Sequence, residues 1–166
     1  MKPWILAAAF AIALGSTGVF AHEDGKGGKT AVPPGAKKPK GHGAELGKPG
    51  DASKVSRTIE VRMGDDMRFK PATIRVKRGE TVKFVVKNNG RLQHEMVLGT
   101  MRELKEHAAL MRKFPEMEHD DPNAVAVEPG KTGTLIWQFT KAGEFDFACL
   151  VPGHFEADMV GRILVD

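Results

Sequence analysis

The chain has 166 residues, with 25 Lys and Arg against 21 Asp and Glu, which gives a formal charge of +4. This length is enough for one domain with additional segments, and so weak a positive charge gives no reason to expect nucleic-acid binding. The single cysteine excludes a disulfide bond within the chain.

The first 21 residues have the pattern of a cleavable signal peptide. Lys2 precedes an apolar run from Trp4 to Leu14, and residues 19–21 fit a cleavage site. The run is too short to span a membrane, although an uncleaved N-terminal anchor is the alternative. We therefore expect export to the periplasm and no transmembrane segment in the mature protein. In that oxidising compartment an unpaired thiol is a liability unless it is buried or bound to metal.

Residues 22–54 are rich in Gly, Lys and Pro and contain few residues able to build a core. This composition predicts a disordered tail. Cleavage after Ala21 would make His22 the first residue, and its α-amine and imidazole could then chelate copper together. A plain polar tail residue is the alternative interpretation.

Residues 55–166 change to short segments of alternating apolar and polar residues, the pattern of half-buried strands. Around residues 100–114, apolar residues recur instead at helical spacing from Met101 to Met111, with Thr100 as the N-cap. Turn residues separate the strands at the spacing typical of an all-β sandwich. We expect about seven to eight strands with one helical insert. The clearest strands cover 58–63, 72–77, 81–87, 94–98, 132–140, 145–149 and 161–165.

The segment FDFACLVPGHFEADM, residues 145–159, carries the strongest chemical signal. Cys149, His154 and Met159 have the spacing C-x4-H-x4-M. Thiolate, imidazole and thioether suit a soft or borderline metal, and with a second histidine they make the ligand set of blue-copper sites. Alternation along the strand that precedes the loop directs the thiol into the core. The pattern therefore predicts a copper site.

The remaining histidine must come from elsewhere in the chain. His94 is the best candidate because it begins an expected strand. His107 lies on the expected helix and His119 in a polar loop, so both are weaker candidates. One cysteine excludes a dinuclear copper centre that needs two, and the sequence has no H-x-H pair of the kind that multicopper oxidases use.

Over about residues 57–166 the chain resembles the cupredoxins, the plastocyanin/azurin-like type 1 copper proteins. The resemblance rests on MRFKPATIRVKRGETVKFVVKNNG, QHEMVLG and FDFACLVPGHFEADMVGRILV. It implies a Greek-key β-sandwich in which His94, Cys149 and His154 are the equatorial copper ligands and Met159 is a weak axial ligand. The likeness is strongest to periplasmic bacterial cupredoxins associated with copper tolerance.

Two residues depart from the family pattern. Many cupredoxins have Asn directly after the first histidine, where it braces the cysteine loop by hydrogen bonds, whereas this chain has Glu95 there, and Leu150 follows the cysteine. A carboxylate near the site could change its electron density, geometry and colour. The hypothesis is a perturbed type 1 centre, for which a green rather than blue colour is one expected form.

Further soft ligands suggest a second, weaker copper site. Met63 and Met67 flank Gly-Asp-Asp, and Met117 and His119 lie close together in an acidic loop. Thioethers select Cu(I). The alternative is that the methionines fill the core.

Two functions fit this pattern, both with copper ions as the partner. The first is copper tolerance or homeostasis in the periplasm, with cycling between Cu(I) and Cu(II). The second is soluble one-electron transfer to a periplasmic redox protein of a respiratory pathway. We expect a monomer that is not an enzyme, with oxidation of cuprous ion during copper tolerance as the alternative.

Overall fold

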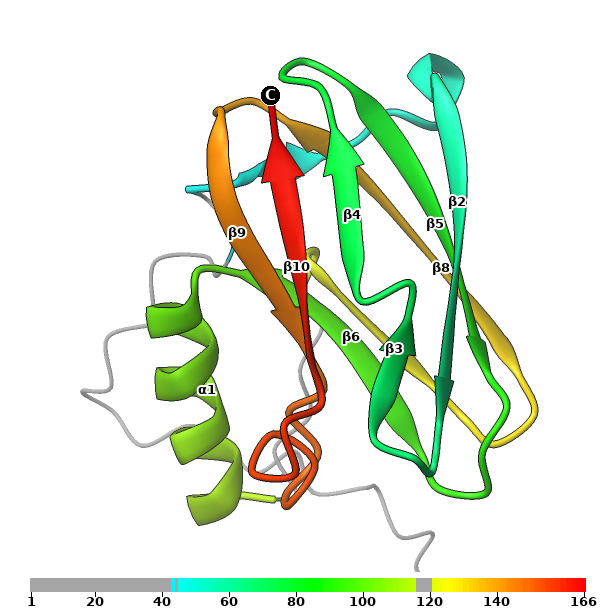
Figure 1. Cartoon of the computed structure of the whole chain (residues 1–166), viewed down its shortest axis with the longest axis vertical. Coiled ribbons are helices and arrows are strands. Elements are labelled where there is room, and N and C mark those ends of the chain that lie inside the picture. The colour runs from blue at the N-terminus through cyan, green and yellow to red at the C-terminus, as the bar shows by residue number, and fades with distance from the viewer. Residues whose placement is uncertain (1–42, 44, 116–120) are drawn as a thin grey trace, which may run out of the picture. The chain divides into compact units, whose positions relative to one another are not determined.

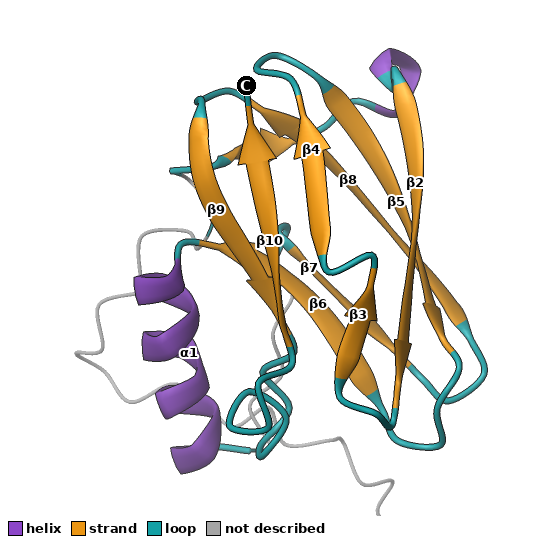
Figure 2. Cartoon of the chain, viewed as in Figure 1, coloured by secondary structure: helices purple, strands orange, loops and turns teal. Residues whose placement is uncertain are grey.

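The computed structural model describes residues 43, 45–115 and 121–166, which form two β-sheets, one α-helix and one short 3₁₀ turn (Figure 1, Figure 2). The elements in chain order are β1 (Gly47–Pro49), η1 (Ala52–Lys54), β2 (Arg57–Gly64), β3 (Arg68–Lys70), β4 (Thr73–Val76), β5 (Thr81–Asn88), β6 (His94–Gly99), α1 (Met101–Lys113), β7 (Ala124–Val127), β8 (Thr132–Phe139), β9 (Gly143–Ala148) and β10 (Val160–Val165).

The ten strands are divided equally between two sheets. The strand order is β1-β8-β5-β2-β3 in one sheet and β4-β10-β9-β6-β7 in the other. Each sheet contains one parallel pair, β2 with β5 and β4 with β10, and its other neighbours are antiparallel. The predicted class, an all-β sandwich with one helical insert, is therefore confirmed.

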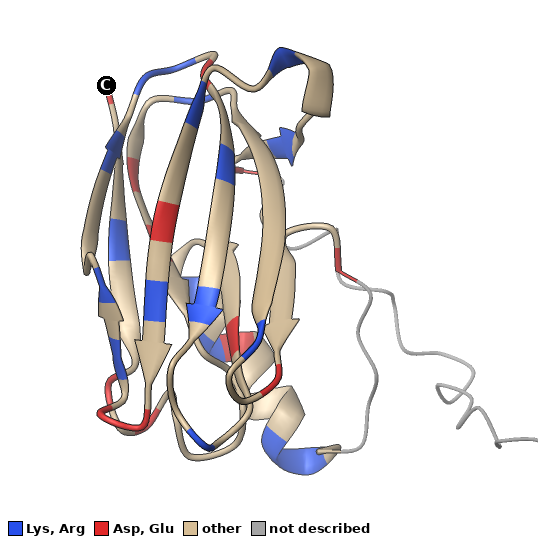
Figure 3. Cartoon of the chain, turned by 90° about the vertical axis from the view of Figure 1, so that its right-hand side faces the viewer, with Lys and Arg blue, Asp and Glu red and all other residues tan. Residues whose placement is uncertain are grey.

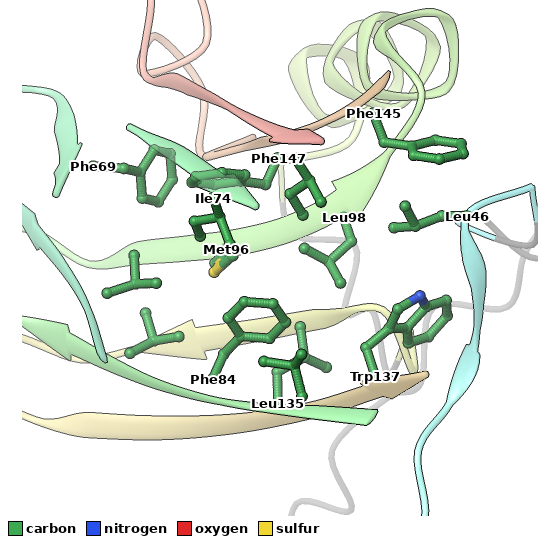
Figure 4. Packing of buried hydrophobic residues seen from close by; sticks show 14 of the residues in the cluster. Leu46, Phe69, Ile74, Phe84, Met96, Leu98, Leu135, Trp137, Phe145 and Phe147 are labelled. Atoms are coloured by element: carbon green, nitrogen blue, oxygen red, sulfur yellow. The ribbon is translucent and has the colours of Figure 1, made fainter. Parts of the chain in front are cut away.

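The core lies between the sheets because each long strand buries every second side chain. Phe84, Leu135 and Trp137 lie on one side of this core. Ile74 and Met96 approach them from the opposite sheet (Figure 4). The alternation predicted for residues 132–140 and 145–149 is confirmed, since the apolar side chains of both segments are buried. This alternation fixes which side chain at the end of β9 enters the core.

Three strands were not expected from the sequence. β1 lies inside the segment predicted to be disordered, and it pairs antiparallel with β8. The adjacent Leu46 is fully buried in the core, so the prediction of a tail is wrong for its last residues. β3 and β7 lie outside the expected strands, because they have only three and four residues, too few to show an alternating pattern.

The helix α1 begins and ends where the sequence predicts. Thr100 is the N-cap and forms a capping box with Glu103, in which each side chain accepts a hydrogen bond from the other residue's backbone N–H. Leu104, Ala108 and Met111 pack in a cluster that also contains Leu150. The helix therefore covers the side of the sandwich next to the cysteine loop.

The surface charge of the domain is mixed. In the view of Figure 3, Lys and Arg are spread along the strands instead of gathering at one place. Some are paired, as in Lys87 with Glu60 at 2.6 Å and Arg57 with Glu80 at 2.9 Å. Among the described residues, no helix has the length and apolar character needed to cross a membrane.

Candidate metal centre

Two ends of strands and one loop bring the candidate ligands together. His94 is the first residue of β6, and Cys149 directly follows β9. His154 and Met159 belong to the loop that joins β9 to β10. Figure 1 shows this loop at one end of the sandwich, between α1 and β3. The pairing of β6 with β9 therefore brings His94 close to Cys149, although the two residues are 55 positions apart in the sequence.

The ligand atoms of three residues form a tight triangle. His94 Nδ1 lies 3.1 Å from His154 Nδ1 and 4.0 Å from Cys149 Sγ, and His154 Nδ1 lies 3.3 Å from the same sulfur. Bonds of roughly 2.0 Å to imidazole and 2.3 Å to thiolate keep the ligands of one ion at roughly these separations. Within the part of the chain that the structure describes, His94, Cys149 and His154 form a cluster that could hold a metal ion.

The environment of the triangle suits a metal that binds nitrogen and sulfur. His94 and Cys149 are fully buried and His154 is 8% exposed. Burial raises the pKa of the Cys149 thiol to about 12 and lowers the pKa of His154. His154 is therefore neutral, as a ligand must be, and a thiolate at Cys149 needs a positive partner such as a metal ion. The His₂Cys donor set fits copper.

Met159 is the last residue of the loop that joins β9 to β10. Its side chain is fully buried. Its backbone N–H donates to the carbonyl of His154 at 3.1 Å, and its carbonyl accepts from the N–H of Cys149, also at 3.1 Å. Both bonds tie Met159 directly to two ligand residues. Its assignment as the axial ligand stays a prediction.

Glu95 takes over the bracing that Asn provides in many cupredoxins. Its carboxylate accepts a hydrogen bond from the backbone N–H of Leu150 at 3.0 Å, and its own N–H points to Cys149 Sγ at 3.4 Å. Burial raises the pKa of the Glu95 carboxyl. The departure from the family pattern therefore places a buried carboxyl group near the sulfur and leaves the brace in place.

Two residues near the centre were not predicted from the sequence, and both lie between the strands expected at 58–63 and 72–77. Asp65 Oδ1 lies 3.4 Å from His94 Nε2. Arg68 Nη1 donates to the backbone carbonyls of Ala157 and Asp158, at 3.0 and 3.3 Å, just before Met159. These partners are separated by 29 residues for Asp65 and about 90 for Arg68, so no local pattern indicates the contacts.

The helix also forms an ion pair with the loop that joins β9 to β10, which is called the ligand loop below. Arg112, in the last turn of α1, forms an ion pair with Glu156. Glu156 in turn accepts a hydrogen bond from the N–H of Gly153, next to His154, at 3.2 Å. Phe155 packs against the same cluster as the helix. The helical insert is therefore joined to the loop on both sides of His154.

Among the described residues, the suggested second copper site receives no structural support. Met63 is 2% exposed and lies in the hydrophobic core, and Met67 packs against that core. Core packing accounts for both without a metal. Met117 and His119 lie outside the described residues, so their part in a second site stays a prediction.

The comparisons with known proteins agree with this fold and site. The family of copper-binding proteins described as the plastocyanin/azurin family matches residues 55–166. The chain therefore belongs to the plastocyanin/azurin family of copper-binding proteins. The copper-resistant cuproprotein CopI of Rubrivivax gelatinosus is 61% identical over 119 residues, covering 72% of each chain. The CopI of Pseudomonas aeruginosa is 43% identical over 153 residues, covering 75% of this chain and 84% of the relative.

Two solved structures show the same fold. Auracyanin B has a TM-score of 0.61 at 21% identity, covering 73% of this chain and 96% of auracyanin B. Auracyanin A from Chloroflexus aurantiacus, titled a blue copper protein, has a TM-score of 0.56 at 26% identity, covering 66% of this chain and 98% of auracyanin A. The family identifies copper as the metal that the described cluster is suited to bind.

Proposed function

We propose that the chain binds one copper ion through His94, Cys149 and His154, with Met159 as a weak axial ligand, and serves copper tolerance in the periplasm. The buried triangle of two imidazoles and one thiol carries this proposal, because its atoms lie 3.1 to 4.0 Å apart. Bound copper would supply one-electron chemistry between Cu(I) and Cu(II). The four side chains are almost fully buried, and two of them lie at strand ends, so they would keep a similar arrangement in both oxidation states.

Copper tolerance is supported by the relatives. Proteins 61% and 43% identical to this chain are named copper-resistant cuproproteins. Residues 1–21 have the pattern of a signal peptide for export, and an oxidising compartment suits a cysteine that is held by metal. We extend the relatives' role in copper resistance to this chain on these grounds.

One-electron transfer to a redox partner is the second candidate function. His154 is the least buried of the proposed ligands, at 8% exposed, and the exposed Pro152 and Gly153 precede it in the chain. Half-buried Val151 and Phe155 complete an apolar surface of the kind that a partner protein can contact. An electron carrier needs a short path from a metal ligand to the protein surface, whereas a protein that only stores copper does not.

A deletion strain separates the two functions. Tolerance predicts loss of growth only under added copper, restored by the wild-type gene and not by Cys149→Ser. Electron transfer predicts loss of a respiratory activity without added copper. Oxidation of cuprous ion, the enzymatic alternative, predicts oxygen uptake that depends on Cu(I) and on the purified chain. Normal growth under copper stress with a respiratory defect would overturn copper tolerance as the function.

A further inference from the structure

Asp65 lies beside the proposed metal centre and contacts the His94 ring. It follows β2, and its Oδ1 lies 3.4 Å from Nε2 of His94. The His94 ring is fully buried, and its other nitrogen, Nδ1, faces His154 and Cys149. The ring therefore connects a carboxylate on one side with the proposed copper position on the other.

Backbone hydrogen bonds hold the Asp65 carboxylate in place independently of His94. The backbone N–H of Arg91 donates to both oxygens at 3.0 and 2.9 Å, and that of Leu92 donates to Oδ1 at 3.2 Å. A Cβ at Gly90 would overlap Asp65 Oδ1, so glycine is required for this close approach. These hydrogen bonds, chiefly the one from Arg91, lower the pKa of Asp65. Asp65 is therefore a fixed, ionised acceptor beside the ring.

The position of the carboxylate determines where a neutral His94 carries its single proton. An ionised carboxylate only accepts hydrogen bonds, so it favours the tautomer with the proton on Nε2. Nδ1 is then an open lone pair, which is the state that binds a metal. Histidine ligands commonly donate their other N–H to a carboxylate, and this contact fixes the tautomer and raises the basicity of the ligand.

We propose that Asp65 is a positioning residue of the copper site, which keeps the His94 proton on Nε2 and, through its negative charge, favours Cu(II) over Cu(I). This inference rests on the copper site proposed above. It assigns a role to the turn between β2 and β3, which supplies no ligand. The neighbouring Asp66 pairs with Lys70 at 2.6 Å and has no contact with a ligand, so it provides a matched control.

The first test uses the metal-free protein. Long-range ¹H–¹⁵N NMR of the imidazole rings locates the His94 proton in the wild type, Asp65→Ala, Asp65→Asn and Asp66→Asn. We expect the proton on Nε2 in the wild type and in Asp66→Asn, and a mixture of tautomers in Asp65→Ala. Asp65→Asn keeps an oxygen that can accept, so it should retain the Nε2 tautomer. A wild-type proton on Nδ1 would overturn the inference.

The second test uses the copper-loaded protein. Both Asp65 variants should bind Cu(II) about 10- to 100-fold more weakly, with a smaller loss for Cu(I). A tenfold difference between the two losses raises the reduction potential by about 59 mV. Asp66→Asn should change neither affinity.

Three outcomes of the second test are decisive. Equal losses for Cu(I) and Cu(II) with an unchanged potential would show a merely structural role and overturn the inference. An equal effect of Asp66→Asn would show a general charge effect and also overturn it. A wild type that binds no copper would overturn the proposed function itself, whereas a copper-binding wild type matched by Asp65→Asn in both affinities overturns only the role of Asp65.

Discussion

The carboxylate of Glu95 accepts a hydrogen bond from the backbone N–H of Leu150 at 3.0 Å, across the gap between β6 and the cysteine loop. Leu150 is 1% exposed, so its N–H has no ready access to solvent. The bond therefore holds the residue after Cys149 in place before any metal arrives.

Removal of this brace should destabilise the metal-free fold. Glu95→Ala leaves the buried N–H of Leu150 without its acceptor, which costs about 1–3 kcal/mol. Glu95→Gln should cost less, because its amide oxygen can accept the same bond. Denaturant unfolding of the metal-free protein measures both, with the exposed Glu106→Ala on α1 as the control. Equal stability of Glu95→Ala and Glu106→Ala would contradict the bracing role.

The charge of Glu95 should influence the colour of the copper-loaded protein. The carboxyl group of Glu95 reaches the backbone beside the sulfur ligand, and its ionised form would raise the electron density of the site. We expect a perturbed, greenish type 1 spectrum in the wild type and a shift toward an ordinary blue, axial spectrum in Glu95→Asn. Visible absorption and EPR test this. An ordinary blue, axial wild type would refute the perturbed centre.

The helical insert should stabilise the ligand loop through its apolar face. Leu104 is 1% exposed and packs in the cluster that contains Leu150. Leu104→Ala should lower the free energy of unfolding by about 2–5 kcal/mol and speed the loss of copper to a chelator. The exposed Lys105→Ala on the same helix is the control. Unchanged copper release in a destabilised Leu104→Ala would confine the helix to a role in folding.

Arg68 should hold the part of the loop that precedes Met159. Its guanidinium donates to the carbonyls of Ala157 and Asp158. Arg68→Ala should speed copper release about fivefold, which corresponds to about 1 kcal/mol, because the backbone beside Met159 becomes freer to move. Stopped-flow competition with a chelator measures this rate. Arg62→Ala, which removes an exposed pair with Glu60, should leave it unchanged, and equal rates in both variants would contradict the role of Arg68.

The sequence predicted the elements that repeat a pattern and missed those that are too short to show one or that depend on distant partners. Alternation located β5, β8 and β9, and with them the direction of Cys149, because a strand aims every second side chain at the core. The short β1 and β3 carry too few residues for a pattern and exist through pairing with β8 and β2.

The same distinction between local patterns and distant contacts applies to the residues of the metal centre. Cys149, His154 and Met159 were found from local spacing, and His94 from its place at the start of a strand. Asp65 and Arg68 reach the centre only because the turn between β2 and β3 folds beside β6 and the ligand loop. Glu95 was noticed as a departure, but its hydrogen bond to Leu150 required the geometry of the fold.

The central claim is that copper is held by the thiolate of Cys149 together with His94 and His154. The most direct measurement is the copper content and visible spectrum of the purified wild type beside Cys149→Ser, which keeps nearly the same side-chain size. We predict one copper per wild-type chain with an intense sulfur-to-copper absorption band, and loss of both in Cys149→Ser. Copper retained at the same content in Cys149→Ser, with the same spectrum, would contradict the account.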